Sequence, residues 1–354
     1  MKNIRSITQD ELARQCKVWG EPAFRVKQVW EWIWKKHVGS IEAMTNLPKS
    51  LREKLAASYF IPKVEIHHSQ YSQDGTIKNR LRLYDGHFVE SVLIPTDKRI
   101  TVCVSSQVGC SLSCAFCATG YMPRKRNLQF DEIVDEVTLA QEQALKHYGK
   151  GITNIVFMGM GEPLLNYQNV LQSISVITDP EGMGMSPRRI TVSTAGVAKM
   201  IRKLGDDGVR FKLALSLHAA NDAKRNEIMP INETNNLASL VDALNYFYAK
   251  TKNEITFEYI LFRGFNDGPQ DAKELIKIYR RVPADLVNII EYNPIQDADF
   301  QKPDEEVSEQ FLAMLQAAKV NARLRRSRGK DIDAACGQLA NIDHPSMAKS
   351  VSHA

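Results

Sequence analysis

The chain has 354 residues, enough for one large α/β domain and a small second one. Its hydrophobic content of 44% and charged content of 25% are those of an ordinary globular protein, and no stretch approaches the roughly 20 apolar residues of a membrane span. No apolar signal segment follows the first residues, and six cysteines, three of them clustered, do not suit a secreted disulfide framework. We therefore expect a cytoplasmic protein that has no membrane partner.

The excess positive charge lies at the N-terminus. Residues 1–65 hold 12 Lys/Arg and 7 Asp/Glu, and the other 289 residues hold 34 of each, so the net charge of +5 belongs to the first segment. Apolar residues at helical spacing predict helices over 9–18, 24–36 and 48–59. Basic residues surround three tryptophans in the second helix, which fits RNA-backbone binding, although a solvated face over a tryptophan core explains it equally well. We predict that residues 1–65 form a basic helical RNA-binding accessory domain.

Alternating apolar and polar residues predict a short β extension over residues 66–97. From residue 98, strand-like runs alternate with amphipathic helical stretches. The predicted strands are 100–104, 152–158, 189–194, 211–217, 255–262 and 285–292. The predicted helices are 131–147, 167–177, 197–204, 236–250, 269–281 and 305–319. Six such β–α units predict an α/β fold, a partial (β/α)6 TIM-like barrel over residues 98–330, followed by a C-terminal tail over 331–354.

Three cysteines follow the first predicted barrel strand at CxxxCxxC spacing: Cys110, Cys114 and Cys117. Three thiolates do not complete a structural zinc site, which normally takes four protein ligands. An iron–sulfur cube can leave one iron without a protein ligand, and that iron can bind a small molecule. The spacing therefore favours an iron–sulfur cluster. A zinc site completed by a distant residue, or three buried apolar cysteines, remain open at this point.

Unusual residues follow five of the predicted strands. They are the cysteine loop and the segments 159–163, 191–196, 216–218 and 292–294, which are rich in Gly, Ser, His and Asn. All of them lie at carboxyl ends of strands, the face on which barrel enzymes assemble their active sites. Taken singly, each is more often a turn or a cap, but five on one face predict an enzyme.

The cysteine motif, with Phe116 before its last cysteine, resembles that of the radical S-adenosylmethionine (radical SAM) enzymes. Further runs are very close to the radical SAM adenine methyltransferases that modify RNA, and among these to the RlmN family. These runs are FMGMGEPL, SPRRITVSTAG, SLHA, MPIN and GKDIDAACGQL, with Cys103 seven residues before Cys110. The resemblance covers nearly the whole chain and departs at no cysteine position.

This resemblance implies a radical SAM barrel that uses a 4Fe-4S cluster and two SAM molecules per turnover. Cys110, Cys114 and Cys117 would hold the cluster. The residues matching the family's SAM pocket are Gly161, Glu162, Ser193, Ser216, Leu217, His218 and Asn293.

The reaction implied by the resemblance needs a second kind of cysteine. C2 of adenine is electron-poor and does not attack the methyl group of SAM, whereas a thiolate does. Cys336 would take the methyl from one SAM, and a radical formed from a second SAM would activate that methyl for addition to C2, joining RNA and protein. Glu90 would accept the C2 proton, and Cys103 would release the RNA through a transient disulfide with Cys336. The plain alternatives are a solvent-facing Glu90 and a core Cys103.

The implied substrate is 23S rRNA and, in some members, tRNA, with an external electron donor such as flavodoxin; we expect a monomer. Three alternatives stay open. One is C8 methylation of the same adenine, as in the Cfr relatives. Another is a zinc-stabilised RNA-binding protein in which Cys336 completes a four-thiolate site. The last is a radical SAM enzyme for a small molecule or peptide, against which the basic run 323–330 speaks.

Overall fold

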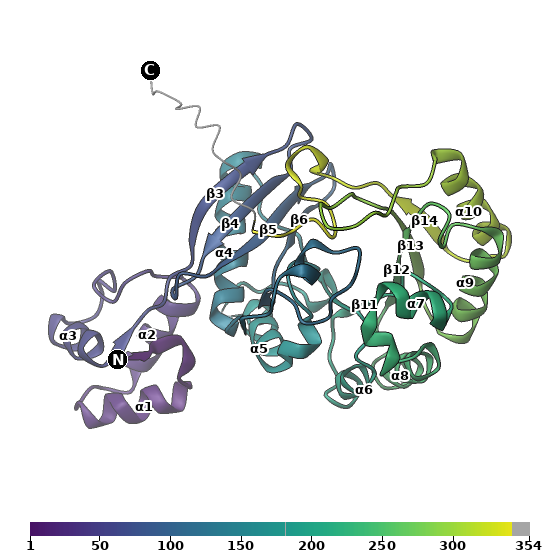
Figure 1. The fold of residues 1–354 in the computed structure, drawn as a ribbon. Helices are drawn as coiled ribbons and strands as arrows, with labels where there is room; N and C mark the ends of the chain where they lie inside the picture. Colours follow the sequence, from purple (N-terminus) through teal and green to yellow (C-terminus); the bar gives the residue numbers. More distant parts are fainter. Residues whose placement is uncertain (181, 342–354) are drawn as a thin grey trace, which may run out of the picture.

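The N-terminal part is a small helical unit at one end of the molecule (Figure 1). A computed structural model describes residues 1–180 and 182–341. The first helices are α1 (Gln9–Val18), α2 (Phe24–Trp34) and α3 (Lys49–Ser58). A capping box at Thr8 and Glu11 starts α1, and the short strands β1 (Lys2–Asn3) and β2 (Tyr59–Phe60) pair in parallel. The three predicted helices are confirmed.

One ten-stranded sheet runs through the rest of the chain in the order β14-β13-β12-β11-β10-β9-β6-β5-β4-β3. Its parallel strands are β6 (Ile100–Cys103), β9 (Asn154–Phe157), β10 (Ile190–Thr194), β11 (Lys212–Ser216), β12 (Ile255–Leu261), β13 (Leu286–Glu291) and β14 (Ala322–Arg325). Because β14 and β3 are the two free ends, the sheet curves without closing. The predicted partial barrel is confirmed, with β14 as a further strand.

Helices cover the outer face of this curved sheet (Figure 1). They are α4 (Phe130–Tyr148), α5 (Tyr167–Thr178), α6 (Ala198–Asp206), α7 (Asp222–Ile228), α8 (Leu237–Thr251), α9 (Pro269–Arg281) and α10 (Glu305–Ala317). Their apolar faces bury side chains such as Leu204, Leu244 and Leu275 against the strands. None of the helices in the described ranges is long and apolar enough to cross a membrane.

The predicted β extension joins the main sheet. Strands β3 (Glu65–Tyr71), β4 (Ile77–Arg82) and β5 (Phe88–Pro95) are antiparallel, and β5 pairs with β6. Side chains alternate along a strand, so Glu90 lies on the same face as Val92 and Ile94, which line the central cavity. The extension therefore forms one wall of that cavity.

Two small elements frame the cysteine loop, and one segment crosses above it. β7 (Gln107–Val108) pairs with β8 (Arg126–Asn127), closing the loop at its base. After β14 the chain returns through residues 326–341 and lies over the end of β5 and β6, shown yellow in Figure 1. This return places the C-terminal segment beside the cavity. Residues 342–354 of the predicted tail lie outside the described residues.

Candidate active site

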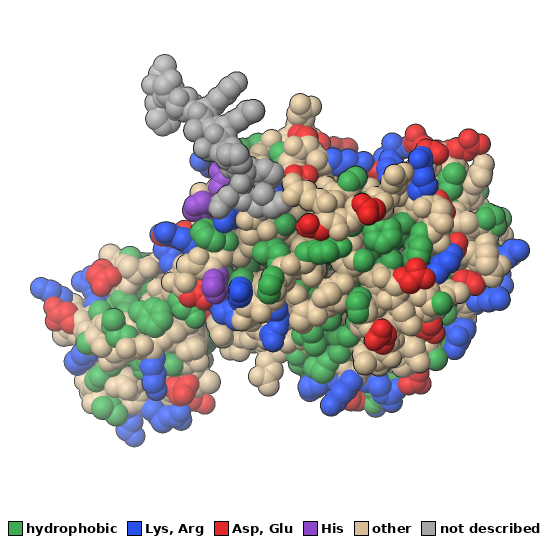
Figure 2. Space-filling model, in the orientation of Figure 1, with side chains coloured by type: hydrophobic (Ala, Val, Ile, Leu, Met, Phe, Trp, Pro, Cys, Tyr) green, Lys and Arg blue, Asp and Glu red, His purple; other side chains and the backbone are tan. Residues whose placement is uncertain are grey.

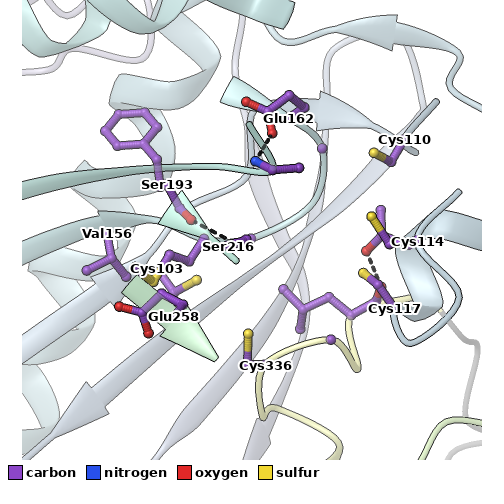
Figure 3. A pocket seen from close by; sticks show the side chains of 18 of the residues that line it. Cys103, Cys110, Cys114, Cys117, Val156, Glu162, Ser193, Ser216, Glu258 and Cys336 are labelled. Carbon is purple, nitrogen blue, oxygen red and sulfur yellow. Dashed lines mark hydrogen bonds between the residues drawn. The ribbon is translucent and has the colours of Figure 1, made fainter. Parts of the chain in front are cut away.

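A single cavity at the carboxyl ends of the parallel strands collects most of the predicted site residues (Figure 3). Its walls come from the cysteine loop, from the segments after β9, β10 and β11, and from the C-terminal segment. The predicted residues that line it are Cys103, Cys110, Cys114, Cys117, Gly161, Glu162, Ser193, Ser216, His218 and Cys336. Residues more than 200 positions apart in the sequence therefore face one space.

The cysteine loop is held by its own backbone and by its neighbours. Cys117 N donates to Cys114 O at 3.2 Å, and Ala115 N donates to Ile228 O of α7 at 3.0 Å. Phe116 packs its ring edge against His218, with centroids 4.7 Å apart. The aromatic residue of the motif therefore anchors the loop to the wall of the cavity, while the cysteines on either side face inward.

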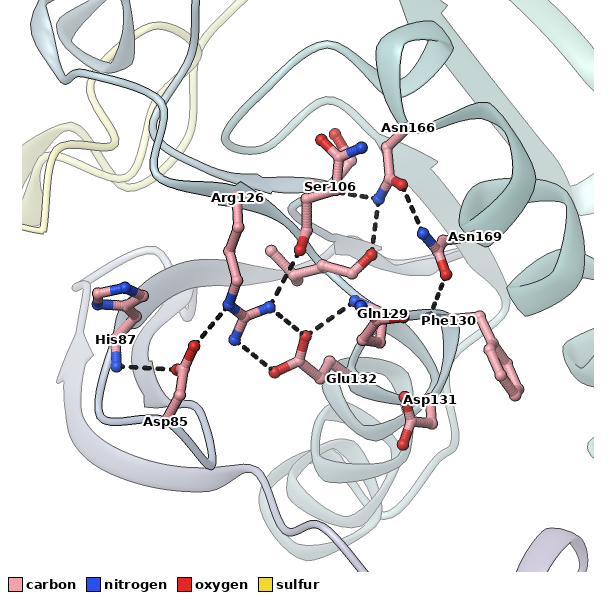
Figure 4. A network of polar contacts seen from close by, with 12 residues as sticks. Asp85, His87, Ser106, Arg126, Gln129, Phe130, Asp131, Glu132, Asn166 and Asn169 are labelled. Carbon is pink, nitrogen blue, oxygen red and sulfur yellow. Dashed lines mark hydrogen bonds and ion pairs between the residues drawn. The ribbon is translucent and has the colours of Figure 1, made fainter. Parts of the chain in front are cut away.

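A polar network fixes the base of this loop (Figure 4). Arg126 donates two hydrogen bonds to Glu132, at 2.7 and 2.8 Å, and a third to Asp85 at 2.6 Å. Asn166 donates from Nδ2 to the carbonyls of Ser106 and Leu128, both at 2.8 Å. The bidentate pairing of Arg126 with Glu132 restricts the orientation of the two side chains as well as the distance between them. The loop is thereby tied to the β4–β5 turn and to the start of α4.

The thiol donors fit an iron–sulfur cluster. Burial raises the pKa of Cys110 to about 11 and also raises the pKa values of Cys114 and Cys117, so these thiols need a metal to become thiolates. Within residues 1–180 and 182–341, no three His, Cys, Asp or Glu side chains are gathered closely enough to hold a single metal ion. The three thiols instead border a space, as a cube with one thiolate for each bound iron requires.

Glu162 lies in the segment after β9. Its carboxylate accepts hydrogen bonds from Ala195 N at 2.8 Å and from Leu164 N at 3.0 Å, and burial raises its pKa to about 6. Gly161 beside it has φ +93°, and a Cβ there would lie 2.5 Å from Cβ of Gln107. Only glycine fits this approach, so the turn brings Glu162 to the cavity wall.

The next two segments contribute small polar groups. Ser193 Oγ lies 3.3 Å from Ser216 Oγ. Burial lowers the pKa of His218 to about 3, and its Nδ1 accepts from Ile260 N at 3.1 Å, so the ring is neutral and carries its proton on Nε2. Together these groups offer hydroxyls and one ring N–H to a polar ligand.

The opposite wall of the cavity carries the other two thiols. Figure 3 shows Cys336 directing its sulfur into the cavity, with Cys103 and Glu258 further along the wall. Arg325 reaches the same wall from β14, where it pairs with Glu258 at 3.4 Å. Burial raises the pKa of Cys103 to about 12, and the enclosing protein raises that of Cys336 to about 11, although Cys336 is open to the cavity. The Arg325 cation opposes both rises.

Comparison with known proteins identifies the family to which this chain belongs. The model of the ribosomal RNA large subunit methyltransferase N-terminal domain matches residues 2–61, and that of the radical SAM superfamily matches residues 104–277. The "Probable dual-specificity RNA methyltransferase RlmN" of Cytophaga hutchinsonii is 57% identical, over 96% of this chain and 93% of its own length. The chain belongs to the RlmN family of radical SAM RNA methyltransferases.

A second RlmN relative and a solved structure agree. The dual-specificity RNA methyltransferase RlmN of Nitratidesulfovibrio vulgaris is 43% identical, over 96% of this chain and 94% of its own length. A crystal structure of a radical SAM methyltransferase from Sphaerobacter thermophilus has 39% identity and a TM-score of 0.89, and covers 96% of this chain and 99% of that one. Membership of the RlmN family makes the chain a SAM-dependent methyltransferase. It is therefore neither the zinc-stabilised binding protein nor the small-molecule or peptide radical SAM enzyme considered above.

Three predicted site residues of this RlmN-family chain do not line the cavity. Leu217 is fully buried, and its N–H donates to Glu258 O at 2.9 Å. Asn293 donates to Ser327 Oγ at 3.0 Å and to Cys336 O at 3.4 Å, so it supports the C-terminal segment. Glu90 is buried behind the same segment, where it accepts from Ala340 N at 2.9 Å.

The six cysteines are free thiols in this structure, so a resting disulfide between Cys103 and Cys336 is not supported. The basic run 323–330, which spoke against a small-molecule or peptide substrate, is engaged with the protein itself. Its cations contact protein groups, namely Arg323 with Asn288, Arg325 with Glu258, Arg326 with Glu305, Arg328 with Asp74 and Lys330 with Glu291. A count of charges cannot distinguish cations that pair with groups of the same protein from cations that are available to bind RNA.

Several important residues were missed by sequence reasoning. Glu258 is the single charge within the apolar strand β12, a signal that could have marked it as inward-facing, whereas the basic run around Arg325 gave no such signal. Arg225 of α7 is fully buried and donates to neutral oxygens, those of Leu217, Asn232, Ala195 and Ser216. It ties together the segments after β10 and β11 that face the cavity. No pattern in the short α7 indicated this role.

Proposed function

We propose that this enzyme methylates C2 of an adenine in 23S rRNA and an adenine in tRNA, through a methyl group carried on Cys336. The observation that carries the proposal is the presence of Cys336 in the cavity that Cys110, Cys114 and Cys117 border. The relatives are named dual-specificity RNA methyltransferases, which supports two substrates, and the family model that matches residues 2–61 supports ribosomal RNA as one of them. The Glu162-Pro-Leu run, which resembles RlmN more than Cfr, favours C2 over C8.

The cysteine triad would hold a 4Fe-4S cluster, and the segments at the ends of β9, β10 and β11 would hold SAM. When bound, these groups supply the electron and the adenosyl radical that activate the methyl carbon. Gly161, Glu162 and Ser193 would orient SAM, with Ser216 and His218 completing its polar surroundings. The two-SAM stoichiometry follows from this scheme, because one molecule donates the methyl and the other the radical.

The chain's own groups perform the remaining steps. Cys336 attacks the methyl of SAM as a thiolate, and the Arg325 cation favours that form. Once RNA is joined to Cys336 through the methylene carbon and the adduct radical has given up its unpaired electron to the cluster, Glu90 would take the proton from C2. The Cys103 thiolate then attacks the sulfur of Cys336 and forms a transient disulfide as the sulfur–carbon bond breaks. The bond pair stays with the methylene carbon, which takes up a proton and becomes the methyl group of the base. Both thiols line one cavity, which supports this exchange.

The position of methylation is tested with purified, cluster-loaded enzyme and 23S rRNA or tRNA. We expect 2-methyladenosine in nucleosides separated by chromatography and mass spectrometry. The matched control is Cys336→Ala, which should retain iron but give no methylated adenosine. Detection of 8-methyladenosine instead would favour the Cfr-type alternative and overturn the C2 assignment.

We further propose that residues 1–65 dock the RNA. Lys and Arg side chains are scattered among apolar ones over this unit (Figure 2), and Lys36 stacks its ammonium 3.8 Å from the centre of the Trp32 ring. Arg14, Lys17 and Lys27 are exposed. Replacing these three with Gln should weaken RNA binding and reduce the slope of log Kd against log salt by about 0.7–0.9 for each phosphate group that the protein no longer neutralises. An unchanged slope would contradict docking through these residues.

Several broader expectations belong to the same proposal. The boundaries at residues 65, 97 and 330 divide the chain into an RNA-docking domain, a β extension that forms one wall of the cavity, the barrel, and a tail that carries Cys336. We propose a cytoplasmic monomer that receives its electron from an external donor such as flavodoxin. Size-exclusion chromatography with light scattering tests the monomer.

A further inference from the structure

The segment that carries Cys336 is held at both ends by one buried pair of charges. Lys78 Nζ donates to Asp333 O at 3.3 Å, just before the cysteine. Glu90 Oε2 accepts from Ala340 N at 2.9 Å, just after it. Lys78 Nζ lies 3.6 Å from Glu90 Oε1, and the two side chains are only 5% and 3% exposed. The pair therefore closes the base of the loop Asp333–Ala340.

Sheet register explains why these two residues meet. Lys78 on β4 lies opposite Val92, and Glu90 on β5 lies opposite Arg80, so Lys78 and Glu90 are diagonal neighbours on one face. Diagonal neighbours on antiparallel strands are about 7–8 Å apart, within reach of a long side chain. The same face of the sheet points toward the C-terminal segment. The two side chains therefore contact that segment directly from regular strands.

The other contacts of the loop are different in kind. Ala118 N donates to Gly337 O at 2.7 Å, and Thr119 Oγ1 donates to Leu339 O at 2.6 Å. These bonds join the loop to the cysteine motif and involve only neutral groups. A change of charge on Glu90 would therefore alter the described contacts that Lys78 and Glu90 make at the two ends of the loop.

We propose that Lys78 is a positioning residue, which together with Glu90 forms a clasp that holds the loop Asp333–Ala340 and so places the Cys336 sulfur in the cavity. The clasp also links loop position to the reaction, a part that rests on the proposed role of Glu90. When the C2 proton moves to a carboxylate oxygen of Glu90, the side chain becomes neutral. Its attraction for Lys78 and its charge-assisted bond to Ala340 then weaken.

This weakening falls at the step where movement is needed. Cys336 must be held still while it accepts the methyl group and while its methyl carbon is activated. After C2 has lost its proton, the Cys336 sulfur must instead meet the sulfur of Cys103. A clasp that is closed with charged Glu90 and loosened by proton uptake meets both requirements.

Hydrogen–deuterium exchange of the cluster-loaded enzyme, without RNA, tests the clasp independently of activity. Lys78→Met and Glu90→Gln each remove the ion pair and should accelerate exchange in the peptide spanning residues 333–340 about tenfold. Lys78→Arg should exchange like the wild type. The matched control is Arg82→Met, which removes a cation of the same strand whose partner, Glu65, is at the surface. Wild-type exchange in Lys78→Met, or a uniform increase throughout the barrel, would overturn the proposal.

Methyl uptake by Cys336 from SAM, followed by peptide mass spectrometry, gives a second readout. This first stage needs no RNA and no base at C2, yet we expect both Lys78→Met and Glu90→Gln to slow it about tenfold, with Lys78→Arg restoring it. Normal uptake in Glu90→Gln would contradict the clasp while leaving Glu90 as proton acceptor. If the wild type itself takes up no methyl on Cys336, the proposed function fails, and the exchange data still decide the clasp.

Discussion

The two thiol-bearing walls of the cavity differ in what surrounds the sulfurs. On the cysteine loop, Cys110, Cys114 and Cys117 have backbone and apolar neighbours, and their loop is tied down by Arg126 and Asn166. On the opposite wall, Cys103 and Cys336 lie near the Arg325–Glu258 pair. Burial raises the thiol pKa values on both walls. The Arg325 cation opposes the rise at both Cys103 and Cys336, whereas on the cysteine loop Arg225 opposes it at Cys114.

On the proposed assignment, the loop thiols are cluster ligands and the thiols of Cys103 and Cys336 are reactants. A metal-bound thiol is deprotonated by the metal itself, so the loop needs rigidity more than it needs a counter-charge. A thiol that must attack carbon or sulfur needs thiolate character at the moment of reaction, and a neighbouring cation supplies part of it. On this proposal, residues of one type would serve two purposes because of their neighbours.

The largest expected effect is on the ligand wall. Cys114→Ala should remove the iron and abolish methylation, because two thiolates do not hold the cluster. Iron analysis and the absorbance of the anaerobically purified protein measure this. The matched control is Cys16→Ala, since Cys16 is also a free thiol but lies in α1 of the N-terminal helical unit, far from the cavity in the fold. Full iron content in Cys114→Ala would contradict the assignment of the triad.

On the reactant wall, Cys103→Ala should leave the iron intact and stop the reaction at release. Without the attacking thiol, the sulfur–carbon bond persists, so RNA accumulates covalently attached to Cys336. Denaturing gel electrophoresis with labelled RNA detects the adduct. Cys103→Ala combined with Cys336→Ala should show none. Free methylated RNA at the wild-type rate from Cys103→Ala would refute its resolving role.

The smallest expected effect concerns the cation. Arg325→Met should raise the pKa of Cys336 further above about 11, because removing a positive charge disfavours the thiolate. At neutral pH the thiolate fraction, and with it the rate of Cys336 methylation, should fall about tenfold. The rate should still increase with pH up to that pKa in both proteins. Arg325→Lys should stay close to the wild type. Identical pH profiles for Arg325→Met and the wild type would contradict the comparison.

Strongly periodic segments could be predicted from the sequence. The helix α9 coincides with its predicted range 269–281, and β12 differs from its prediction by one residue. The short α7 and the charged β14 were missed, since seven residues give little periodicity and a basic run masks strand alternation. The carboxyl-end rule placed the cysteine loop, Glu162, Ser193 and His218 on one face, because parallel strands all end at the same edge.

The sequence by itself determined the cysteine spacing, the order of strands and helices, and the family, since these depend on local pattern and motif. Only the tertiary structure decided which charges meet. It paired most cations of the basic run with acidic groups of the same chain, brought Arg325 to the thiols, and joined Lys78 to Glu90 beneath the loop of Cys336. The physical reason is that such contacts depend on strand register and on the return path of the chain, which link residues hundreds of positions apart and leave no periodic trace in the sequence.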